Sequence, residues 1–155
     1  MGKKNRNPNK QQQSWHPKAA EQPRDRKFEV GTARPPEEPK RFSWSFASVD
    51  HDGPFGWDRC TSRADAKDVA TKLAQFEGMN QNQLSRQGSH PIPIAQLCRE
   101  AQDRLRVLKI DDIDELFSLR MTGRKRVFCR LLGDVMRILW WDPEHNVCPS
   151  NLTHT

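Results

Sequence analysis

A stretch of alternating apolar and polar residues begins just after residue 40. In residues 42–46, FSWSF, three aromatic side chains alternate with serines. Successive side chains of a strand point to opposite faces, so this alternation predicts a half-buried β-strand. Residues 50–58, DHDGPFGWD, are rich in Gly, Pro and Asp, which predicts a turn.

Two longer stretches have the apolar spacing of a helix. In the first, Ser62 and Asp65 resemble a capping box and Gly78 closes the helix. Its apolar face consists of Ala66, Val69, Ala70, Leu73 and Phe76. A short helical turn is predicted near residues 81–86. In the second stretch, Pro93 suits the first helical turn. The buried stripe of this second helix consists of Ile94, Leu97, Cys98, Ala101, Leu105 and Leu108.

The last third of the chain returns to the spacing of strands. Residues 116–121, 126–132 and 135–141 read as three strands, and the short turns at 122–123 and 133–134 would fold them into a meander. The sequence therefore predicts an α+β fold. In it, a small antiparallel sheet, made of the N-terminal strand and the C-terminal three-stranded meander, packs on two helices.

Composition divides the chain near residue 40. Residues 1–40 hold ten Lys and Arg against five Asp and Glu, with many Pro and Gln and few apolar side chains. Such a segment cannot bury enough apolar surface to offset its chain entropy. We therefore expect a disordered basic tail over 1–40 and a single α+β domain over 41–155. The charge of the tail either adds salt-sensitive affinity for nucleic acid or keeps the segment solvated.

The sequence shows no sign of a membrane or exported protein. Its longest strongly apolar runs are about four residues, whereas a membrane helix needs roughly 20. No apolar stretch follows the charged start, so we expect a cytoplasmic protein that does not contact a membrane. The cysteines lie far apart without a CxxC pair, so no metal or cofactor is predicted. In a reducing cytosol they would be small apolar core residues, namely Cys60, Cys98, Cys129 and Cys148.

Acidic and imidazole side chains follow the most apolar run of the chain. Residues 138–141, ILWW, predict a strand buried on both faces, and Asp142 and His145 come directly after it. Side chains at a strand end are held by a rigid scaffold and still reach solvent. His145 is the best candidate for proton transfer, with Asp142 to orient or charge it, and His90 is a second candidate. The alternative is an ordinary turn in which these side chains have no chemical role.

Basic side chains crowd the predicted meander. On an alternating strand, Arg126 and Arg130 share one face with Phe128. Guanidinium groups pair with phosphates and an aromatic ring stacks on a base, so this face is a candidate nucleic-acid platform. The candidate nucleic-acid contacts are Arg120, Arg124, Lys125, Arg130 and His90. The alternative is the solvated face of an antiparallel sheet.

The predicted order of elements, with Arg on the middle meander strand and an acid or His at the end of the last, resembles the RelE/ParE toxin superfamily of bacteria. The run LFSLRMTGRKRVFCRLLGDVMRILWWDPEHNVCP is also similar to small bacterial proteins of mostly unknown function that share a C-terminal LWWDPEHxvyP motif. The likeness covers about residues 41–149. The resemblance to RelE-like ribonucleases implies that Arg126 clamps a phosphate and that His145 is the general acid or base. The chain has no Tyr, which excludes a Tyr-based mechanism.

Two classes of function follow. The first is the toxin of a type II toxin–antitoxin system that cleaves or binds RNA without a metal. Its catalytic residues would be His145, Asp142 and Arg126, and its partners an antitoxin protein and RNA or the ribosome. The second is a non-enzymatic module that binds protein or nucleic acid, which includes ParE-like inhibition of gyrase. The near-neutral charge of residues 41–155, sixteen Lys and Arg against fifteen Asp and Glu, favours the second.

Overall fold

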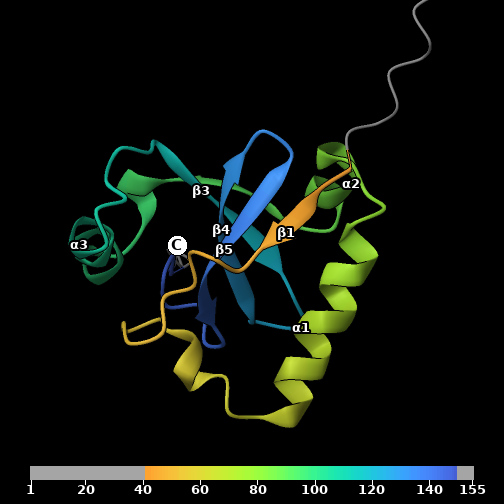
Figure 1. The fold of residues 1–155 in the computed structure, drawn as a ribbon, viewed down its shortest axis with the longest axis horizontal. Helices are drawn as coiled ribbons and strands as arrows, with labels where there is room; N and C mark the ends of the chain where they lie inside the picture. Colours follow the sequence, from red (N-terminus) through yellow and green to blue (C-terminus); the bar gives the residue numbers. More distant parts are fainter. Residues whose placement is uncertain (1–40, 150–155) are drawn as a thin grey trace, which may run out of the picture. The chain divides into compact units, whose positions relative to one another are not determined.

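The described part of the chain is built around a five-stranded sheet (Figure 1). The computed structural model describes residues 41–149, so the tail predicted for residues 1–40 lies outside the described residues. In chain order the elements are β1 (Ser43–Ser45), η1 (Trp57–Arg59), α1 (Arg63–Phe76), α2 (Gln81–Arg86), β2 (His90–Pro93), η2 (Ile94–Gln96), α3 (Arg99–Val107), β3 (Glu115–Arg120), β4 (Arg126–Leu132) and β5 (Val135–Asp142). The predicted α+β class is therefore confirmed.

The strands lie in the order β1-β5-β4-β3-β2. β3, β4 and β5 form the predicted antiparallel meander, and β2 pairs antiparallel with β3. β1 is parallel to β5, with Ser43 opposite Val135, so the sheet is mixed and the prediction of an antiparallel one is wrong. Two strands joined by a short turn must be antiparallel. All the other elements separate β1 from β5 in the chain, so the connection between these two strands does not fix their relative direction.

The stretch before the second predicted helix also differs from the prediction. His90–Pro93 forms the edge strand β2, and the helix α3 begins at Arg99 instead of Pro93, after the 3-10 turn η2. Pro93 lies opposite Glu115 in the sheet. Proline fits an edge strand because it has no backbone N–H to offer a further strand. Pro93, which was expected in the first turn of a helix, is instead the last residue of the edge strand β2.

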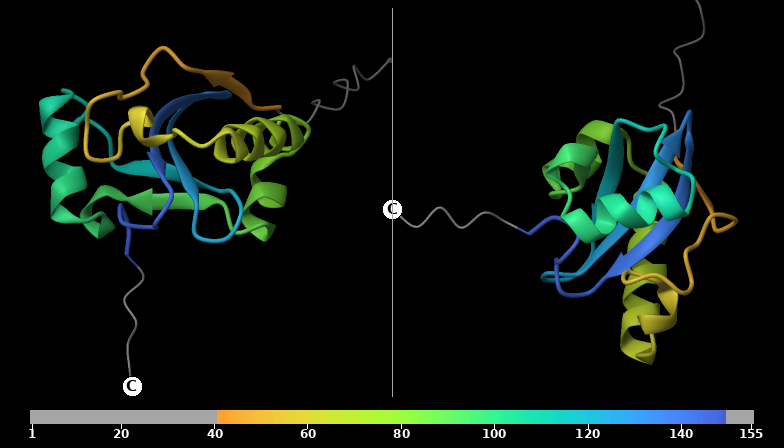
Figure 2. Two further views of the ribbon diagram at one scale, coloured as in Figure 1. Left: turned by 90° about the horizontal axis from the view of Figure 1, so that it is seen from below. Right: turned by 90° about the vertical axis from the view of Figure 1, so that its left-hand side faces the viewer.

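Helices cover both faces of the sheet, with α1 and α3 on opposite sides of it (Figure 2). Apolar residues of α1 and α2 pack in one core cluster with Val127 and Trp141, whereas those of α3 pack in a second cluster with Phe128 and Trp140. We expected two layers, a sheet packed on two helices. That prediction is wrong, because the sheet lies between helices on both of its faces. Because β4 and β5 carry apolar side chains on both faces, neither face can remain in water.

Because β5 contains a bulge, side chains of the ILWW run pack in both core clusters. All four of its side chains are at most 1% exposed, as predicted for a strand buried on both faces. The strand has one extra residue, Leu139, opposite the step from Phe128 to Cys129. The bulge places Leu139 and Trp140 together in the α3 cluster, and Trp141 returns to the other one.

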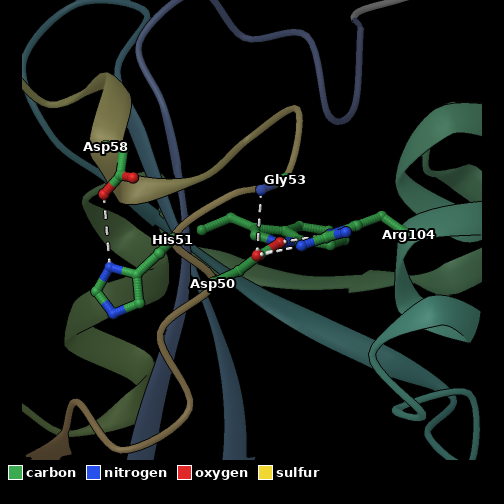
Figure 3. A network of polar contacts seen from close by, with 6 residues as sticks. Asp50, His51, Gly53, Asp58 and Arg104 are labelled. Carbon is green, nitrogen blue, oxygen red and sulfur yellow. Dashed lines mark hydrogen bonds and ion pairs between the residues drawn. The ribbon is translucent and has the colours of Figure 1, made fainter.

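Asp50 ties the loop after β1 to α3 and β5 (Figure 3). The residue is 4% exposed, and its carboxylate accepts hydrogen bonds from Arg104 at 2.9 and 2.7 Å, from Trp140 Nε1 at 2.9 Å and from the Gly53 N–H at 3.2 Å. The bonds from Arg104 lower the pKa of Asp50, although burial raises it. A Cβ atom at Gly53 would collide with both partners of the ion pair, so only glycine fits there.

We expect Asp50→Asn to lower the free energy of unfolding by about 2–4 kcal/mol at pH 7, because Arg104 and Trp140 would lose a charged buried partner. The pKa of Asp50 in the folded state lies below its ordinary value of 3.8. The carboxylate therefore contributes its full stability above about pH 5 and loses it as the pH falls through the folded-state pKa. Urea denaturation at several pH values measures this, with Asp58→Asn, an exposed carboxylate nearby, as control. A difference between wild type and Asp50→Asn that stays constant down to pH 3 would contradict it.

Candidate functional site

Three of the predicted site residues form a row across the end of the sheet. Arg120 is the last residue of β3, Arg126 the first of β4 and Asp142 the last of β5. Arg120 lies opposite Arg126, and Arg126 lies opposite Asp142. Alternation along β4 places this row on the same face as Phe128, which is the face that α3 covers further along the strands.

Arg120 and Arg126 form a pair of like charges. Burial lowers the pKa of Arg126, and the positive charge of Arg120 lowers it further, whereas Asp142 raises it. Arg126 Nη1 donates to the carbonyls of Gly123 at 3.0 Å and Lys125 at 2.9 Å. Within residues 41–149, neither guanidinium has a carboxylate within ion-pair distance. Since directly opposed like charges destabilise a sheet, an anion bound between them would be favoured.

The loop before β2 positions Arg120. The Arg120 backbone N–H donates to the hydroxyl of Ser89, which is fully buried, at 2.9 Å. Gly88 has a φ of +84°, and a Cβ atom there would lie 3.0 Å from Arg120 Cδ and 3.1 Å from its Nη1. The Arg120 side chain therefore lies directly over Gly88. Gly88 and Ser89 were not among the predicted site residues, because the contact joins residues about thirty positions apart.

Asp142 holds the segment that carries His145. The Asp142 side chain is 2% exposed, and its two oxygens accept the backbone N–H groups of Asn146 at 2.9 Å and Val147 at 2.8 Å. These bonds close a turn in which His145 has a φ of 64°, a left-handed conformation that a non-glycine residue rarely adopts. The expected pairing of Asp142 with His145 is not among the hydrogen bonds of the described residues. Asp142 acts here as a positioning residue for the turn.

The two candidate histidines lie in different surroundings. His145 is half-buried, and its ring has no hydrogen bond or ion pair with a residue in the range 41–149. His90 is exposed on the edge strand β2, opposite Ser118, and its ring Nδ1 lies 3.0 Å from the carbonyl of Pro91. Because Ser118 precedes Arg120 by two positions, His90 is on the same face of the sheet as Arg120.

The remaining candidate contacts divide into free and paired cations. Lys125 forms an ion pair with Asp65 of α1, which raises the pKa of Lys125. Arg130 pairs with Asp112 at 3.4 Å. Arg124 is exposed in the turn between β3 and β4 and has no partner among residues 41–149. Of the predicted basic residues, Arg120, Arg124 and Arg126 are therefore available at this end of the sheet.

The proposed stacking platform on β4 is not present. Phe128, the aromatic ring that would stack on a base, is 1% exposed and lies in the core cluster under α3. Ring stacking needs an accessible face, so Phe128 cannot contact a nucleic acid in this structure. The sequence shows the alternation along β4 but not which helix covers that face.

Within residues 41–149, no group of three His, Cys, Asp or Glu side chains could hold a metal ion. No helix of that range is long and apolar enough to cross a membrane. No family model matches the chain, and neither a curated protein nor a solved structure is significantly similar to it. The resemblance to RelE/ParE toxins stays a prediction.

Replacing Asp142 tests whether it holds the turn. We expect Asp142→Ala to lower the free energy of unfolding by about 2–4 kcal/mol, because two backbone N–H groups lose a buried charged acceptor. Asp142→Asn keeps one acceptor oxygen but places an amide NH2 donor against the second N–H, so it should also destabilise the protein. Chemical denaturation gives the stability, and hydrogen exchange of the Asn146 and Val147 amides reports the turn directly. Unchanged exchange at both amides in Asp142→Ala would exclude this role.

Proposed function

We propose that this chain is the toxin of a type II toxin–antitoxin system, an RNA-binding protein of RelE-like type that cleaves RNA without a metal. The observation that carries the proposal is the row at the end of the sheet. It combines Arg120 and Arg126, whose guanidinium groups have no carboxylate partner among residues 41–149, with the segment after Asp142 that carries His145.

Arg120, Arg126 and His145 each have a role in this proposal, and Asp142 holds the turn that carries His145. Arg120 and Arg126 bind a backbone phosphate and stabilise the negative charge that grows on it as the bond to the attacking oxygen forms. His145 acts as the general acid or base, since imidazole gains and loses a proton readily near neutral pH. The ribose 2′-oxygen gives up its proton, attacks phosphorus and displaces the 5′-oxygen, which takes a proton. The products are a 2′,3′-cyclic phosphate and a free 5′-hydroxyl.

The distribution of charge supports RNA over a less charged ligand. Residues 41–155 have a net charge of only about one, but Arg120, Arg124 and Arg126 gather at one end of the sheet. Such a local concentration attracts a phosphate backbone even when the domain as a whole is nearly neutral. In the proposal, the protein acts in the cytoplasm, and an antitoxin protein neutralises it by covering this row.

A second candidate function is a non-enzymatic module that binds a protein or a nucleic acid, including ParE-like inhibition of gyrase. The observation that favours it is the use of Asp142, whose two oxygens are both bound to backbone N–H groups. A catalytic His145 would then lack the acid that was expected to orient it. In this alternative, the arginine row binds its partner and no bond is broken.

Binding to RNA should depend on the arginine row. We expect Arg120→Ala and Arg126→Ala each to weaken binding of a labelled single-stranded RNA by about tenfold and to reduce the salt dependence of binding by about one phosphate contact. Arg137→Ala is the matched control, because Arg137 is an exposed arginine near the start of β5, away from the end that holds the row. Fluorescence anisotropy at several salt concentrations measures both quantities. Equal losses in Arg137→Ala and the two row variants would contradict a specific site.

Cleavage should depend on the imidazole of His145. We expect induced expression of the wild type to arrest growth and the purified protein to leave 2′,3′-cyclic phosphate ends on RNA. His145→Asn should abolish both effects, because asparagine tolerates the left-handed backbone but transfers no proton at neutral pH. Circular dichroism confirms that the variant is folded.

The same variants separate the two candidate functions. Growth arrest that persists in His145→Asn but disappears in Arg126→Ala would support the non-enzymatic module. A harmless wild type, expressed in folded form, would exclude the toxin.

A further inference from the structure

Two cysteines from distant parts of the chain meet beside the first turn of α3. Cys98 is the N-cap residue of α3, and its backbone N–H donates to the carbonyl of Val147 at 2.8 Å. The Cys148 thiol lies 3.5 Å from the carbonyl of Gln96. Residues 147–148 therefore run alongside residues 96–98, and Cys98 and Cys148 are neighbours across this contact.

Both thiols are accessible and close enough to influence each other. Cys98 and Cys148 are half-buried and free, so a small reagent can reach them. Burial raises the pKa of the Cys148 thiol, and the neighbouring Cys98 and Asp142 raise it further. The electrostatic effect of Cys98 on Cys148 agrees with the backbone contact that places them side by side.

The other two cysteines have different surroundings. Cys129 is fully buried in the core cluster on the α1 side of the sheet. The charges that act on Cys60 are those of Asp65 and Lys125, near the start of α1. Among the described cysteines, only Cys98 and Cys148 are thus placed to react with each other.

We propose that Cys98 and Cys148 form a reversible disulfide by exchange with a low-molecular-weight disulfide such as oxidised glutathione. One thiolate attacks the reagent, forms a mixed disulfide and releases one reduced thiol. The second cysteine then attacks the protein sulfur of the mixed disulfide, and the second reduced thiol leaves. The protein loses two protons and two electrons, and the reagent gains them.

The bond would fasten the segment that follows β5 to α3. This segment holds the Asp142 turn and His145, and in the reduced protein its described hydrogen bonds to α3 and η2 are those of Val147 and Cys148. A covalent link closes a loop of about fifty residues and restricts opening of the segment. The disulfide is independent of the proposed function, because its formation is measured without any substrate.

Peptide mapping of the full chain tests the bond. The protein is incubated with oxidised or reduced glutathione, free thiols are alkylated, and the denatured protein is digested with trypsin. We expect a linked pair of peptides, 87–99 joined to 138–155, after oxidation and its loss after reduction. Cys60→Ser should form the same linked pair, whereas Cys148→Ser should accumulate glutathione on Cys98. Mixed disulfides without the linked pair, or an equal yield of links to Cys60, would overturn the proposal.

Oxidation should also change the dynamics of the segment. We expect hydrogen exchange of the Val147 amide to slow by about tenfold and the melting temperature to rise by about 5 °C or more in the oxidised wild type. Cys148→Ser, treated in the same way, controls for glutathione added elsewhere. A linked protein with unchanged exchange and an unchanged melting temperature would show that the bond does not fasten the segment.

Discussion

The ion pair between the buried Asp50 and the partly exposed Arg104 is the contact on which the arrangement of the sheet, α3 and the loop after β1 depends. The Asp50 carboxylate accepts four hydrogen bonds, from Arg104, Trp140 and Gly53. A buried charge without these partners would be strongly unfavourable, so any packing that moves α3 away from β5 leaves it uncompensated. The pair therefore favours the position of α3 in which Arg104 reaches Asp50.

That selection has a consequence for the candidate site. The Asp50 contact fixes Trp140, which lies two residues before Asp142 on β5. The same helix α3 receives the segment after β5 through the bond from Cys98 to Val147. The end of β5 is thus held on both sides in the chain. Before it, Trp140 binds the Asp50 carboxylate, and after it, Val147 binds the first turn of α3. A site assembled on such an end keeps its geometry without a ligand.

Two carboxylates that look alike in the sequence have comparable structural roles. Asp50 and Asp142 are both nearly fully buried, and both satisfy backbone or side-chain N–H groups. From the sequence, Asp142 was expected to orient or charge His145, and Asp50 was expected to lie in a turn. Position relative to a strand end cannot distinguish a carboxylate that reacts from one that holds a loop, because that depends on which donors lie within reach in space.

The sequence determined the local elements well. The first helix, the three strands of the meander and the burial of ILWW follow from periods of 3.6 and 2.0 residues, which are properties of neighbouring positions. It also located Arg120, Arg126 and Asp142, whose juxtaposition follows from the register that the meander turns impose. Three features depended on contacts between residues far apart in the chain. They are the placing of a helix on each face of the sheet, the parallel pairing of β1 with β5 and the burial of Phe128. Local periodicity carries no information about such contacts, so only the tertiary structure could decide them.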